Sequence, residues 1–152
     1  MQVSKKKKRK TRIWTILSVI LGVIVLGLGA TMLAFEPGRR EALSLTISEM
    51  EFHKLRDGIY LGEYKGTKDS LRNTKVQVTV ASGKVTEFQV VEGALANEKQ
   101  RTEVGNGFSI NDLLDRVIES QSLQVDIISG ATITSKVHLK AVENALEQAK
   151  HK

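Results

Sequence analysis

The sequence predicts an α+β protein: a twisted antiparallel sheet with packed helices, preceded by a single transmembrane helix. Three observations support this class. An uncharged run extends from Ile13 to Phe35, apolar residues alternate in short strand-like runs between Ile59 and Val91, and apolar residues recur at helical spacing in the C-terminal third. The predicted organisation is a basic tail (1–12), a transmembrane anchor (13–35), a stalk or linker (36–56) and one folded domain (57–152).

The uncharged run is long enough for a membrane span. As a helix it covers about 35 Å at roughly 1.5 Å per residue, and a hydrocarbon core is about 30 Å thick. Trp14 and Phe35 stand at its ends, where interfacial aromatic residues are expected, and a turn at Glu36-Pro37-Gly38 is predicted to end it. A cleaved signal peptide is the competing interpretation, but its apolar region is about 7–15 residues long and no clear small-x-small cleavage site follows this run.

Charge predicts the orientation of this span. The tail carries seven positive charges between Lys5 and Arg12 and no acidic residue, so the positive-inside rule places it in the cytoplasm and the domain outside. Subtracting those charges from the net +6 of the chain leaves −1 for everything downstream. Anionic lipid headgroups explain the basic run next to a span, and we expect no nucleic-acid partner. The chain has no cysteine, which excludes a lipid-acylated N-terminal thiol.

Between the span and the domain, Leu43, Ile47 and Met50 recur at helical spacing. They predict a short helix over about 39–55. This helix could be a free stalk or the first packed element of the domain, and the sequence leaves both open.

The sheet is predicted from three runs. Ile59–Tyr64 forms the first strand, Val76, Val78 and Val80 alternate with polar residues in the second, and Val85–Val91 forms the third after a turn at Ala81–Lys84. The second and third runs therefore make a β-hairpin with one half-buried face.

Two helices complete the domain. After a loop over 93–107 with a turn at Asn106-Gly107, a helix capped by Ser109 or Asn111 should run to about Ser120. Its apolar stripe is Leu113, Leu114, Val117 and Ile118. A last helix begins near Thr134 and is predicted to bury Val137, Ala141, Val142, Ala145, Leu146 and Ala149, with Lys136, Lys140, Glu143, Glu147 and Lys150 outside.

The segment Asp126-Ile127-Ile128-Ser129-Gly130-Ala131-Thr132 lies where a strand-like run (Leu123, Val125, Ile127, Ile128) meets this last helix. Small residues let backbone N–H groups converge on a ligand, and a helix N-terminus favours an anion such as phosphate. The alternative is an ordinary strand-to-helix turn, in which Gly130 supplies a positive φ and a hydroxyl caps the helix, with Thr134 best placed to do so.

Asp-x-x-Ser-Gly-Ala-Thr, continuing as Ile133-Thr134-Ser135 into an Ala-containing helix, resembles the signature of the FMN-binding domain family. That family includes flavin subunits of the sodium-translocating NADH:quinone oxidoreductase and of the Rnf complex. The segment from Asp57 to Gly66 is similar to the family's opening strand, so the resemblance covers about residues 57–150. Many members have Gly after the Asp, where this chain has Ile127.

The resemblance implies FMN as cofactor, esterified through its phosphate to Thr132 by an exported, magnesium-dependent flavin transferase that uses FAD. Asp126, Ser129, Gly130 and Ala131 would complete the segment that the transferase recognises, with Thr134 and Ser135 following it in the cofactor site.

The implied function is a membrane-anchored extracytoplasmic flavoprotein that relays electrons between partner proteins or a quinone. A non-redox or reversible FMN-binding scaffold or sensor is the alternative, favoured by Ile127. A subunit of a large pump is a third possibility, although the chain lacks the extra length of such subunits.

Other chemistry is not indicated. His53, His138 and His151 lack metal-ligand spacing and are expected to face solvent, as are Glu143 and Glu147. There is no nucleophile elbow, P-loop or dinucleotide fingerprint, so we expect no catalytic residues for hydrolysis or group transfer.

Overall fold

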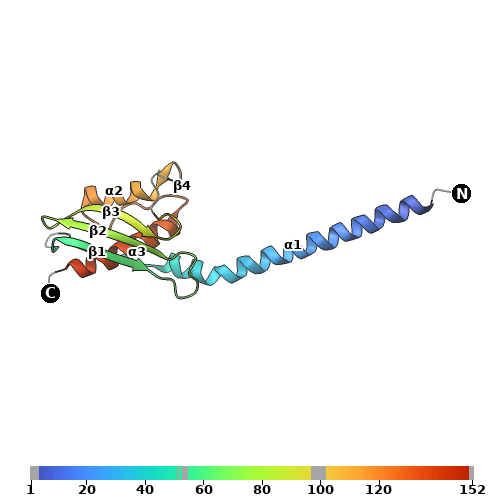
Figure 1. The fold of residues 1–152 in the computed structure, drawn as a ribbon, viewed down its shortest axis with the longest axis horizontal. Helices are drawn as coiled ribbons and strands as arrows, with labels where there is room; N and C mark the ends of the chain where they lie inside the picture. The colour runs from blue at the N-terminus through green and yellow to red at the C-terminus, as the bar shows by residue number, and fades with distance from the viewer. Residues whose placement is uncertain (1–3, 51, 53–54, 97–101, 151–152) are drawn as a thin grey trace. The chain divides into compact units, whose positions relative to one another are not determined.

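A computed structural model describes residues 4–50, 52, 55–96 and 102–150, and side chains within the first helix from Ile13 onward. The chain separates into two compact units, Met1–Pro37 and Gly38–Lys152. Figure 1 shows the order of elements, which begins with helix α1 (Ser4–Ser44).

The described part of the first unit is α1 up to Pro37. Every side chain from Ile13 to Phe35 is exposed, including Trp14 and Leu26, which are 77% and 75% exposed. Within the described residues, α1 is the one helix long and apolar enough to cross a membrane, over Ile13–Ser44. An exposed apolar surface of this length is compatible with a single-pass anchor, because lipid would cover it.

The predicted turn at Glu36-Pro37-Gly38 is wrong: α1 continues through Pro37 to Ser44. Proline lacks one backbone donor, but its fixed φ is compatible with a helix. The last turn is instead fixed by tertiary contacts of the second unit, where Ala42 is fully buried.

The second unit is built on a three-stranded antiparallel sheet in the order β1-β2-β3. Its strands are β1 (Gly58–Tyr64), β2 (Thr74–Ala81) and β3 (Lys84–Glu92). Helix α3 (Thr132–Ala149) covers β1 and β2, and helix α2 (Ile110–Ser120) lies beside β3 (Figure 1). The predicted α+β class is therefore confirmed.

One face of the sheet forms the core. Val76, Val78 and Val80 are buried, and Val78 pairs with Tyr60 on one side and Phe88 on the other. All the residues predicted to be buried in the last helix are buried: Val137, Ala141, Val142, Ala145, Leu146 and Ala149. At Gly62 the helix backbone comes so close that a Cβ would collide with the carbonyl oxygen of Ala141.

The hairpin between β2 and β3 turns at Ser82 and Gly83, with φ of 54° and 74°. Two successive positive φ angles are typical of a type I′ turn, whose twist matches that of the strands. The predicted hairpin is confirmed.

The loop predicted over 93–107 contains a short hairpin that sequence analysis did not predict. Strands β4 (Glu103–Gly105) and β5 (Phe108–Ser109) flank the predicted turn at Asn106-Gly107. Strands this short carry too few residues to show an alternating pattern. Ser109 caps α2 through a reciprocal capping box with Asp112.

The outer edge of β3 is partly occupied by a side chain. Gln121, in a left-handed conformation after α2, accepts a hydrogen bond from the Val85 N–H (3.0 Å) and donates one to the Val85 carbonyl (2.8 Å). One side-chain amide thus takes the place that a neighbouring strand would occupy.

The segment after Ser44 packs on the domain, which resolves the open alternative for the stalk. The predicted helix ends at Ser44, and Leu45–Met50 have no regular structure. Met50, Phe52 and Leu55 are buried in the core, so tertiary contacts replace helical hydrogen bonds here. Part of the predicted helix, Glu51 and 53–54, lies outside the described residues.

Glu143 was expected to face solvent, and this is wrong. It is 3% exposed, forms an ion pair with Lys140 at 2.8 Å, and accepts a hydrogen bond from the Ser48 N–H at 3.3 Å. Burial raises the pKa of Glu143, but the hydrogen bonds from Lys140 and Ser48 outweigh it, so the pKa is lowered overall. The cause is the 45–50 segment, which covers this face of α3.

Candidate functional site

The segment that precedes α3 is an irregular chain rather than the expected strand. Leu123 and Ile128 are buried, whereas Ile127 is 39% exposed and no strand is assigned between them. Arg116 of α2 holds its middle by donating to the carbonyl oxygen of Asp126 at 2.9 Å. No neighbouring strand pairs with this stretch in the described residues, so its apolar residues serve packing without a β ladder.

Helix α3 begins at Thr132, and Thr134 does not cap it. The N-cap residue is Ala131, which offers no side-chain cap. The turn is closed instead by the fully buried Ser135, whose hydroxyl accepts from the Ile128 N–H at 3.1 Å and donates to the Ala131 carbonyl at 2.9 Å. This hydroxyl thereby fixes the path of the chain from Ile128 to Thr132.

The turn is constrained by its backbone at Gly130 and by a close neighbour at Gly105. Gly130 has a φ of 84°, which favours glycine. Gly105 of β4 lies against this turn, since a Cβ added at Gly105 would lie 2.7 Å from the Ser129 carbonyl oxygen. The short hairpin missed in the sequence therefore helps to shape this turn.

A cavity of about 670 Å³ opens beside the start of α3. From the signature it is lined by Gly130, Ala131, Thr132 and Thr134. Its apolar walls come from the end of α1, the loops and α3: Leu43, Leu71, Ala94, Leu95, Val104, Ile133 and Val137. Its other polar residues are Arg39, Arg72, Asn73, Thr74 and His138. Largely apolar walls with a few polar groups are typical of cofactor pockets of this size.

His138 was expected to face solvent, which is wrong, because it is 4% exposed at the cavity wall. Its Nδ1 lies 2.7 Å from the Thr134 carbonyl, which only accepts, so Nδ1 carries a hydrogen. Its Nε2 lies 3.2 Å from the hydroxyl oxygen of Thr74, which also lies 3.1 Å from the Glu92 carbonyl oxygen. A neutral ring with a hydrogen on Nδ1 can only accept at Nε2, so in that state the single Thr74 hydroxyl hydrogen is donated to Nε2 rather than to Glu92. Burial lowers the pKa of His138, although the hydrogen bond to Thr134 opposes this.

The sequence did carry a signal for this burial. Positions 138, 141 and 145 follow helical spacing along the face of α3 that packs on the sheet. Arg72 had no such signal; it reaches the cavity from the loop before β2, where it pairs with Asp69 at 3.1 Å.

The remaining signature residues lie outside the cavity lining. Asp126 and Ser129 are exposed, and Ser135 is buried with its hydroxyl used for the turn. The structure thus brings Gly130, Ala131, Thr132 and Thr134 together at the cavity and leaves Asp126 accessible from solvent.

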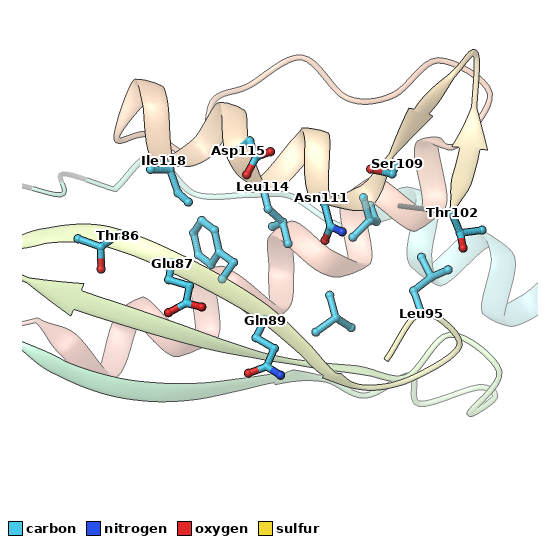
Figure 2. A pocket seen from close by; sticks show the side chains of 13 residues that line it. Thr86, Glu87, Gln89, Leu95, Thr102, Ser109, Asn111, Leu114, Asp115 and Ile118 are labelled. Atoms are coloured by element: carbon cyan, nitrogen blue, oxygen red, sulfur yellow. The ribbon is translucent and has the colours of Figure 1, made fainter. Parts of the chain in front are cut away.

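A second cavity of about 570 Å³ lies between β3 and α2 (Figure 2). Its lining includes Leu114, Asp115 and Ile118 of α2 and Glu87 and Gln89 of β3. No signature residue lines this cavity, so it is a separate feature. Among the described residues, no cluster of His, Asp or Glu could hold a metal ion.

An α+β domain that places a threonine-bearing helix start in the wall of a mainly apolar cavity has the architecture of a cofactor-binding domain. The family model described as FMN-binding domain matches residues 72–147, which is half of the chain and runs from Arg72 in the cavity to Glu147 in α3. The chain therefore belongs to the FMN-binding domain family, and FMN is its cofactor. Neither the curated proteins nor the solved structures gave a match.

Proposed function

We propose that this protein is a membrane-anchored flavoprotein that carries FMN outside the cytoplasm, joined through its phosphate to Thr132, and relays electrons in a membrane-associated redox chain. The observation that carries the proposal is the position of Thr132: the first residue of α3, partly exposed, in the wall of the cavity.

The cavity fits the two halves of FMN. Its apolar walls suit a flat aromatic ring system, and the α3 N-terminus, where backbone N–H groups have no intrahelical partner, favours a phosphate. Arg72 adds positive charge to the same wall. When bound, FMN supplies the electron-transfer chemistry, and the protein supplies attachment, orientation and local polarity.

Of the hydroxyls near the signature, Thr132 and Thr134 line the cavity, whereas that of Ser135 is buried and hydrogen-bonded twice. The family signature favours Thr132. Attachment would form a bond between the Thr132 oxygen and the FMN phosphorus of FAD and release AMP. A threonine hydroxyl is a weak nucleophile near neutral pH, so the base and metal are assigned to an exported flavin transferase.

Asp126 is proposed as a recognition residue for that transferase, because it is exposed and lies outside the cavity. An ester linkage also suits an extracytoplasmic location, where a reversibly bound flavin would be lost by dilution. The electron donor and acceptor are proposed to be partner proteins or a quinone.

The test is coexpression of the full chain with a flavin transferase, followed by peptide mass spectrometry of Val125–Lys136. Thr132→Val should abolish the FMN adduct at nearly unchanged side-chain volume, and Thr134→Val, the matched control, should keep it. Asp126→Ala should lower the yield without unfolding the domain. An adduct on Thr134 or Ser135 would overturn the assignment, and FMN that is bound without any adduct would favour the reversible FMN-binding module.

A further inference from the structure

The end of α1, Gly38–Ser44 (about two helical turns, hereafter the terminal turn), belongs to the compact unit that contains the cavity. Arg39 and Leu43 line the cavity together with Thr132, and Ala42, between them, is fully buried. This turn lies well before residue 72, where the match to the family model begins.

The same helix that begins at Thr132 holds the terminal turn in place. The ammonium group of Lys136 donates to the carbonyl oxygens of Leu43 at 2.6 Å and Leu45 at 3.0 Å. These carbonyls lie at the end of α1 and directly after it, where no further helical turn provides donors, so a lysine from α3 satisfies them. Lys136 lies four residues after Thr132 in α3. Helix α3 therefore carries the proposed attachment residue and also holds Gly38–Ser44 in place.

A second set of contacts joins the terminal turn to the opposite wall. The Glu41 carboxylate accepts from the backbone N–H groups of Thr67 at 2.9 Å and Lys68 at 3.0 Å. Gly38 lies so close to Asp69 that a Cβ would collide with its carboxylate. This loop continues into Leu71 and Arg72, which also line the cavity. Displacing the terminal turn would therefore disturb two walls of the site.

We infer that Gly38–Ser44 is a wall of the flavin site, with Leu43 in contact with the bound flavin and Lys136 as the positioning residue that holds this wall. This inference rests on the proposed function and extends it, because it makes the end of the anchor helix part of the cofactor site. The flavin environment then depends on a turn that the family pattern does not include.

The test uses the full chain in detergent with FMN attached. In the FMN-carrying fraction, Leu43→Ala should increase the Stern–Volmer constant for iodide quenching severalfold and shift the flavin absorption band and reduction potential. Leu43→Met should restore values near those of the wild type, because it refills the wall. Leu45→Ala is the matched control: it removes a half-buried leucine of the same segment that does not line the cavity.

Lys136→Met provides a second variant, since it keeps the apolar stem and removes the three donors. It should expose the flavin to iodide in the same way, with Lys136→Arg as the rescue. Wild-type quenching, spectrum and potential in both Leu43→Ala and Lys136→Met would overturn the inference while leaving flavin attachment intact. Loss of FMN from the wild-type chain itself would instead contradict the proposed function.

Discussion

At the scale of single residues, the site is shaped by buried polar side chains that form hydrogen bonds within the protein. Ser135 closes the signature turn, and His138 joins α3 to β2 through Thr74. Of these, His138 gives the domain a testable response to pH, because its ring is buried and uncharged at neutral pH.

Stability should fall as the pH is lowered from about 7.5 to 5.5. An unfolded histidine has a pKa of about 6.5, and burial lowers the pKa of His138 in the folded chain. Between the two pKa values the unfolded state binds more protons, so the free energy of unfolding rises with pH by up to about 1.4 kcal/mol per pH unit. The contribution of neutral His138 to the free energy of unfolding is fully present above about pH 6.5, and it is lost as the pH falls through the lowered pKa of the folded state.

Urea unfolding of the full chain in detergent at several pH values checks this. His138→Gln should flatten the dependence in this window, while His53 and His151 remain in both proteins. The lowered pKa values of Asp57 and Glu92 place their transitions at lower pH. Equal slopes in wild type and variant would contradict the buried, neutral state of His138.

At the scale of elements, α3 approaches β1 closely at Gly62. A Cβ at Gly62 would collide with the Ala141 carbonyl oxygen and lie 2.8 Å from the Ala145 Cβ. Neither backbone can move without disturbing the sheet or the helix that carries Thr132.

Gly62→Ala should therefore destabilise the domain by about 3 kcal/mol, the upper end of typical overpacking costs. Gly107→Ala is the control, because Gly107 has a φ of 80° but no atom within 4 Å of an added Cβ. It should cost only the backbone strain of about 1–2 kcal/mol. The urea midpoints of the two variants separate the cost of a collision from the cost of backbone strain. A smaller loss of stability in Gly62→Ala than in Gly107→Ala would show that α3 can move away from β1.

Elements with a continuous pattern could be predicted from the sequence. The buried face of α3, the alternating valines of β2 and the seven-residue signature are each encoded by neighbouring or periodic residues. Leu43, Arg72 and Thr74 reach the cavity from separate segments, and nothing local marks them as partners of Thr132. The errors at Pro37 and Glu143 come from tertiary contacts of the 38–50 segment. The error at Thr134 comes from the hydroxyl of Ser135, which closes the turn that a Thr134 cap was expected to close.

At the scale of the whole molecule, the proposed orientation follows from the basic tail before the apolar part of α1. The chain contains no cysteine, so one introduced thiol reports one position. Ser70→Cys, at an exposed position of the second unit, should react with a membrane-impermeant maleimide on intact cells. Ser4→Cys should react only after lysis. Labelling of Ser70→Cys only after lysis would reverse the proposed topology.

The amide of Gln121 on the edge of β3 has a consequence for pairing between copies of this domain. A bare edge strand offers its N–H and C=O groups to any extended chain and can seed sheet-to-sheet aggregation. Here Val85 already has both of its outward groups satisfied by Gln121. Copies of the domain can therefore remain separate at this end of the strand, as the proposed electron-carrier function would require.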